Sequence, residues 1–90
     1  MAIVKIPQPL RSVVEGKNEL EVGADTVGEV LRELESKYPA IKERIKDEEG
    51  SLRRFINVFV DGNDIRHLKG VETPVQNGSE VCILPAIAGG

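Results

Sequence analysis

A single amphipathic helix pattern, with strand patterns on both sides, constrains the fold of this chain more than any other feature. Thr26 and Glu29 have the spacing of a capping box at the start of the helix, and Pro39 ends it. The apolar residues inside it share an arc of about 100°, which makes one stripe. They are Val27, Val30, Leu31, Leu34 and Tyr38. One helix cannot bury such a stripe alone, so it is expected to pack on a sheet.

Period-two alternation predicts strands at residues 2–7 and 18–22 before the helix, and at 55–60 and 80–84 after it. In the third strand Ile56, Val58 and Val60 form the expected inner face. In the last strand Val81 and Ile83 do so. A short return strand is expected to begin near Ile65, and Ile41 with Ile45 indicates one further helical turn. Residues 7–14 read as a loop broken by prolines, and the charged stretch 46–54 is expected to be the most mobile connection.

This order predicts an α+β fold with a mixed sheet, in which the first and last strands lie side by side at the centre. One main helix then covers one face of the sheet. That arrangement is the β-grasp, or ubiquitin-like, fold. We expect residues 1–85 to form this single domain and residues 86–90 to form a flexible C-terminal tail that ends in Gly-Gly.

Composition excludes several classes of function. Twelve basic and fifteen acidic residues give a net charge of −3 and a pI near 5.2, which argues against nucleic-acid binding through a broad basic surface. No apolar run approaches the ~20 residues of a membrane span, and the start does not resemble a signal peptide. A lone Cys82 and a lone His67 argue against a metal site, and the single cysteine fits the reducing cytoplasm.

The end of the sequence indicates a chemistry. A carboxylate becomes an electrophile once ATP adenylates it, and Gly89 and Gly90 carry no Cβ to obstruct entry into a narrow enzyme channel. Ala88 belongs to the same tail. From Pro85 onward the extended tail would reach roughly 20 Å. A sulfur nucleophile attacking the adenylate would leave Gly90 as a thiocarboxylate.

These residues resemble the MoaD/ThiS family of ubiquitin-like sulfur-carrier proteins. The resemblance rests chiefly on the tail, Leu84-Pro85-Ala86-Ile87-Ala88-Gly89-Gly90, with weaker support from residues 25–30 and 55–61. It implies that an E1-like adenylyltransferase and sulfurtransferase activates Gly90. It also implies a non-catalytic carrier that binds no cofactor itself, the ATP being used by the activating partner.

Within that family the sequence is most similar to the branch that serves cysteine biosynthesis. Three features together carry this similarity: residues 83–90, the long charged insert at 46–54, and the stretch Arg54-Phe55-Ile56-Asn57-Val58. It implies a sulfur-accepting pyridoxal-phosphate cysteine synthase as a partner, and a metallopeptidase that releases cysteine. Alternatives remain open: the small subunit of molybdopterin synthase, a carrier for thiamine or tRNA thiolation, and a ubiquitin-like protein modifier.

One surface candidate comes from strand alternation. Burying Asn57 without partners would be costly, so the face that carries Phe59 is expected to point outward. Phe59 and Leu84 would then lie exposed on neighbouring strands as an apolar docking patch. Cys82 is expected to be a small apolar filler rather than a nucleophile, and His67 a loop residue in solvent.

Overall fold

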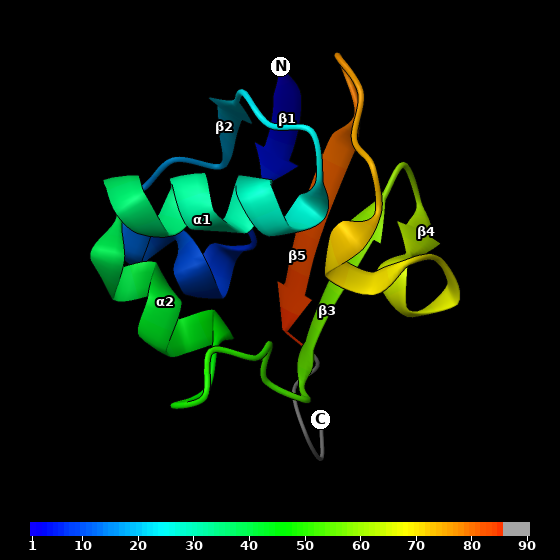
Figure 1. Ribbon diagram of the computed structural model, residues 1–90. Helices are drawn as coiled ribbons and strands as arrows, with labels where there is room; N and C mark the ends of the chain where they lie inside the picture. The colour runs from blue at the N-terminus through cyan, green and yellow to red at the C-terminus, as the bar shows by residue number, and fades with distance from the viewer. Residues whose placement is uncertain (86–90) are drawn as a thin grey trace.

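A mixed five-stranded sheet forms the frame of the molecule in the computed structural model, which describes residues 1–85 (Figure 1). Its strands follow the spatial order β2-β1-β5-β3-β4. They span β1 (Ala2–Lys5), β2 (Glu19–Val22), β3 (Ile56–Val60), β4 (Asn63–Asp64) and β5 (Glu80–Pro85). The mixed sheet and its helices confirm the predicted β-grasp fold.

Strand β5 occupies the centre of the sheet. It pairs in parallel with β1, where Val4 lies beside Val81, and antiparallel with β3, where Val58 lies opposite Ile83. Strand β2 completes one edge by antiparallel pairing with β1. The predicted adjacency of the first and last strands is therefore confirmed.

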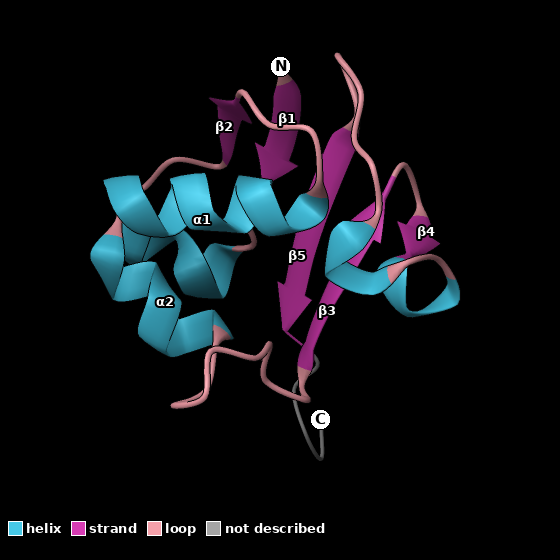
Figure 2. Cartoon of the chain, in the orientation of Figure 1, coloured by secondary structure: helices cyan, strands magenta, loops and turns pink. Residues whose placement is uncertain are grey.

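Helix α1 (Val27–Lys37) and helix α2 (Pro39–Ile45) lie on the same face of the sheet (Figure 2). Thr26 caps α1, since its Oγ1 accepts a hydrogen bond from the Glu29 amide at 3.2 Å. The Glu29 carboxylate reaches back to the Asp25 amide at 3.0 Å, one residue earlier than in the usual capping box. The further helical turn expected around Ile41 is a seven-residue helix that begins at Pro39.

The core lies between the sheet and these helices. The predicted inner faces of β3 and β5 are buried, and so is the α1 stripe apart from half-buried Tyr38. The largest fully buried side chains are Ile6, Leu31, Leu34, Ile41, Ile45 and Ile83. One apolar layer therefore joins every main element, as expected for a chain of this length.

Three predicted segments differ from the structure. The expected loop at 7–14 contains a 3-10 helix, η1 (Gln8–Val14), that buries Leu10 and Val14. The first strand ends at Lys5, although Ile6 is buried and its amide still donates to the Asn18 carbonyl at 2.9 Å. The return strand β4 precedes Ile65, which instead begins a 3-10 turn, η2 (Ile65–His67). A third such turn, η3 (Gly70–Glu72), follows.

The charged stretch 46–54 is held by more contacts than its composition suggests. Lys46 Nζ lies 2.7 Å from Glu35 Oε2 of α1, and both side chains are mostly buried. The Asp47 carboxylate accepts hydrogen bonds from the amides of Glu49 and Ser51, which closes a local turn. Leu52 then packs against the core. The stretch is thus tied to α1 and to the core.

Candidate functional site

The C-terminal end of β5 positions the candidate site. The last β5 pairing with β1 joins Lys5 and Cys82, while β3 continues the pairing as far as Ile56 and Pro85. The chain that follows Pro85 therefore starts from the central strand, held on one side by the first residue of β3. Residues 86–90 lie outside the described part of the structure, and with them the predicted tail residues Ala88, Gly89 and Gly90.

The outward face of the sheet carries the predicted docking patch. Leu84 is 47% exposed, as expected, and lies opposite Asn57 on β3. Phe59 shares this face but is half-buried, which corrects the expectation that it is exposed. It lies between Cys82 on β5 and Asp64 on β4, so that strands flank the ring on both sides. Leu84 extends beyond the paired part of β1, and one of its flanks is therefore open.

Beside Leu84 the surface is hollowed by a cleft of about 350 Å³. Its walls come from β1, β5 and the segment that connects β1 to β2. Lys5 faces outward from β1 and forms an ion pair with Glu19 of β2 at 2.7 Å. Arg11 of η1 forms part of the opposite wall, and its Nε donates to the Ile6 carbonyl at 3.2 Å. Leu84 thus lies beside a hollow lined by both apolar and charged side chains.

Lys5 and Arg11 were not among the residues predicted for this site. Alternation already placed Lys5 outward on a strand expected beside β5, so its position could have been found. The place of Arg11 follows from η1, whose helical path the two prolines concealed.

Cys82 faces outward but is only partly exposed. Burial raises the pKa of its thiol, and the nearby Glu80 carboxylate adds to that rise, while Lys5 opposes it. The thiol is therefore protonated near neutral pH, which makes it a poor nucleophile. This agrees with the interpretation of Cys82 as a filler residue.

The remaining candidates form no reactive cluster. His67 lies exposed in η2, as expected. Within residues 1–85, no group of three or more His, Cys, Asp or Glu side chains is arranged to hold a metal ion. No helix in that same range has the length and apolar character needed to cross a bilayer.

Comparison with known proteins links this geometry to one family. The ThiS family matches residues 4–90. The sulfur carrier protein CysO of Mycobacterium tuberculosis is 40% identical over 89 residues, which cover 97% of this chain and 96% of that protein. A chain in the crystal structure of the Amycolatopsis orientalis BexX/CysO complex superposes with a TM-score of 0.91 at 41% identity, covering all of both chains. The small archaeal modifier protein 1 of Methanosarcina acetivorans superposes with a TM-score of 0.85 at 40% identity, covering 99% of this chain and 95% of that one.

Proposed function

The chain belongs to the ThiS family, and on this premise we propose that it is a sulfur carrier whose working group is the carboxyl group of Gly90. The observation that carries the proposal is the family match through residue 90, together with 40% identity to CysO over almost the whole chain. Its solved relatives include a carrier in complex with a partner, so this chain too is expected to act through partner enzymes.

The proposed reaction has two steps on the partner enzyme. A carboxylate oxygen of Gly90 attacks the α-phosphorus of ATP, which forms an acyl-adenylate and releases pyrophosphate. A sulfide equivalent then attacks the carbonyl carbon and displaces AMP, so that Gly90 ends in a thiocarboxylate. Gly89 and Ala88 bring little side-chain bulk to the enzyme channel. ATP is a substrate of the partner, and the carrier contributes the carboxyl group.

The acceptor most consistent with the similarity to CysO is a pyridoxal-phosphate cysteine synthase. In this proposal the thiocarboxylate sulfur is added to an activated serine derivative held by that enzyme, and a metallopeptidase then releases cysteine. We place this chemistry in the cytoplasm, where a lone cysteine such as Cys82 stays reduced.

We further propose that the outward surface at Leu84 docks the partner. A charged substitution there should weaken binding because it places an ion in an apolar contact. Leu68 supplies a matched control, since it is a leucine of nearly equal exposure, 46% against 47%, on the loop after η2. Leu84→Asp is expected to weaken binding to the activating enzyme, and Leu68→Asp is not. Equal affinities for the two variants would reject this docking surface.

Intact mass spectrometry tests the chemistry. The chain is incubated with ATP, a sulfide source and the E1-like enzyme from its own organism. The expected product is heavier by the difference between one sulfur and one oxygen atom. Deleting Gly90 should abolish that product without a change in melting temperature. Sulfur loading of the truncated chain, or a native chain with further residues beyond Gly90, would contradict the proposal.

A protein modifier is the second candidate, and the similarity to small archaeal modifier protein 1 favours it. Activation is the same, but a lysine amine would attack the adenylate or thioester and form an isopeptide bond. A ladder of conjugates in cell extract would support this alternative. A single thiocarboxylate species would support the carrier.

A further inference from the structure

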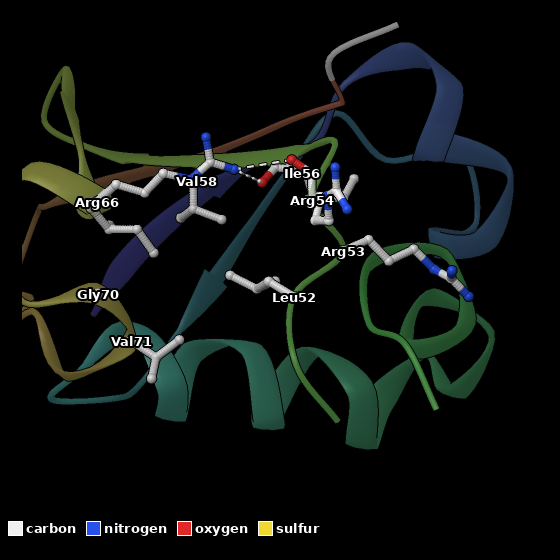
Figure 3. Close-up of a pocket in the computed structure, with 9 residues that line it drawn as sticks. Leu52, Arg53, Arg54, Ile56, Val58, Arg66, Gly70 and Val71 are labelled. Atoms are coloured by element: carbon white, nitrogen blue, oxygen red, sulfur yellow. Dashed lines mark hydrogen bonds between the residues drawn. The ribbon is translucent and has the colours of Figure 1, made fainter. Parts of the chain in front are cut away.

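A second surface hollow lies on the helix side of the sheet, away from the Leu84 surface. It is a cleft of about 300 Å³ between the start of β3 and the η3 turn (Figure 3). A neighbouring cleft of about 390 Å³ runs on toward α1, and both share Leu52 and Val71 as walls. We call the two together the Leu52 groove. Its apolar lining is Leu31, Leu52, Ile56, Val58, Ile65 and Val71.

The Leu52 groove is accessible at Leu52 and Val71, whereas its other apolar lining residues form a buried floor. Figure 3 shows Leu52 and Val71 directed into the space between β3 and α1. Val71 is 46% exposed although it belongs to the lining. At Gly28 the backbone of α1 lies close to η3, since a Cβ on Gly28 would be only 3.2 Å from the Val71 carbonyl oxygen. The groove is therefore narrow on its α1 side.

Arginines stand at both ends of the groove. Arg54 and Arg66 border the cleft at β3, and Arg32 borders the cleft at α1. All three are exposed, and within residues 1–85 none of them forms a salt bridge. Lys46 also borders the groove, but its ammonium is paired with Glu35. A chain with a net charge of −3 thus gathers unpaired positive charge around an apolar groove.

Arg66 is held in place for binding. Its Nη2 donates to the carbonyl oxygens of Arg54 and Ile56, at 3.1 and 3.2 Å, and Figure 3 shows the side chain lying along β3 toward them. These bonds fix the guanidinium and leave the donors on Nε and Nη1 for a ligand. A fixed guanidinium suits a carboxylate, because little side-chain entropy is lost on binding.

We propose that the Leu52 groove binds an acidic peptide segment of a partner protein, in which carboxylate side chains flank an apolar one. The apolar side chain would occupy the space beside Leu52, and the carboxylates would meet Arg32 at one end and Arg54 with Arg66 at the other. Charge complementarity favours this occupant, because carboxylates can form ion pairs with the three arginines and an uncharged segment cannot. The proposal goes beyond sulfur transfer and does not require it.

The position of the groove gives such binding a consequence. Ile56, which lines it, is the β3 partner of Pro85. A segment seated there would lie beside the residue from which residues 86–90 continue, on the opposite side of the sheet from Leu84. The groove would therefore hold a partner at the start of the tail through contacts that the Leu84 surface does not supply.

Titration of the ¹⁵N-labelled full chain tests this proposal. The probe is the synthetic peptide acetyl-Asp-Leu-Glu-Asp-Leu-Glu-amide, and the matched control peptide has Asn and Gln in place of Asp and Glu. The acidic peptide is expected to shift the amide signals of Leu52, Ile56 and Val71, and the neutral one is not. Arg32→Gln and Arg54→Gln, each made alone, should weaken binding about tenfold, which corresponds to the loss of one charge-assisted contact. Lys37→Gln, at the exposed end of α1, should leave the affinity unchanged.

Four results would overturn the proposal. Equal binding of the neutral peptide would show that the arginines do not select the ligand. Shifts confined to Leu84 and Cys82 would place the peptide on the outward face. Equal affinity for a single-stranded oligonucleotide of the same charge would show that the groove responds to charge alone. Shifts of the groove amides when the chain alone is diluted would show that a second copy occupies it.

Discussion

Replacing Ile83 and Leu84 by alanine, one at a time, tests the two-faced role assigned to β5. Ile83 is fully buried against the helices, whereas its neighbour Leu84 is 47% exposed on the outward face. Truncating a buried isoleucine costs about 2–5 kcal/mol, because transfer free energy is lost and a cavity remains. Only about half of the Leu84 side chain is buried, and full burial of such a side chain contributes about 1.5–3 kcal/mol to the free energy of unfolding. Leu84→Ala should therefore cost about 1 kcal/mol.

Urea unfolding followed by far-ultraviolet circular dichroism measures both free energies. A domain of this size unfolds with a slope of about 1–2 kcal/mol per molar urea, so Ile83→Ala should lower the midpoint by more than about 1 M. Leu84→Ala should shift it by less than half as much and still weaken partner binding. The slope itself should not change, since both variants keep the fold. Equal losses of stability, or a larger loss at Leu84, would refute the assignment of faces.

Two further substitutions and one pH titration test other contacts in the structure. Thr26→Ala should lower the free energy of unfolding by about 1 kcal/mol, measured in the same urea assay, because the Glu29 amide loses its cap. Lys46→Met should cost about 1–3 kcal/mol by leaving the mostly buried Glu35 carboxylate unpaired, and the double variant with Glu35→Leu should recover part of that loss in a double-mutant cycle. The rate of Cys82 alkylation should begin to rise at a higher pH in the folded chain than in the urea-unfolded chain, because folding raises the pKa of the thiol. The thiol therefore contributes to folding stability below its unfolded pKa, and this contribution is lost as the pH rises through its folded pKa. Identical pH profiles of alkylation in the two states would contradict this.

The sheet could be predicted because its signals are local and periodic. Alternation along β3 and β5 assigned Val58 and Ile83 to the core correctly. The single apolar stripe of α1 then required a sheet with one covered face, and the order of two hairpin-like ends joined by one helix placed β5 beside β1. These inferences needed only the side-chain period and the count of elements.

Other segments escaped prediction for physical reasons. Pro7 and Pro9 read as helix breakers, so the seven residues of η1 looked like a loop even though Leu10 and Val14 face the core. The stretch 46–54 is held by Glu35, a residue eleven positions from Lys46, and no local pattern reports such a pair. The composition of this stretch therefore gave no sign of the contacts that join it to α1 and to the core.

The predicted docking patch of Phe59 and Leu84 also shows that a local sequence pattern does not determine how exposed a side chain is. Alternation correctly put Phe59 and Leu84 on one face, but exposure also depends on neighbouring strands. β3 lies between β5 and β4, so Phe59 has a neighbour on each side, whereas Leu84 extends past the end of the β1 ladder. Strand register, which sequence alone leaves open, decided which of the two is accessible.

The register of β3 against β5 also places arginines near Pro85, the last described residue before the tail. Pro85 is the last paired residue of β5, and Ile56 holds it from β3. On the outward side, the hollow beside Leu84 includes Arg11; on the helix side, the Leu52 groove includes Arg54 and Arg66. A chain with more acidic than basic residues thus places arginines on both sides of this point. Surface charge at such a point acts on partner choice and on the rate of encounter more than on folding. The proposed partners are therefore expected to present acidic surfaces to these arginines.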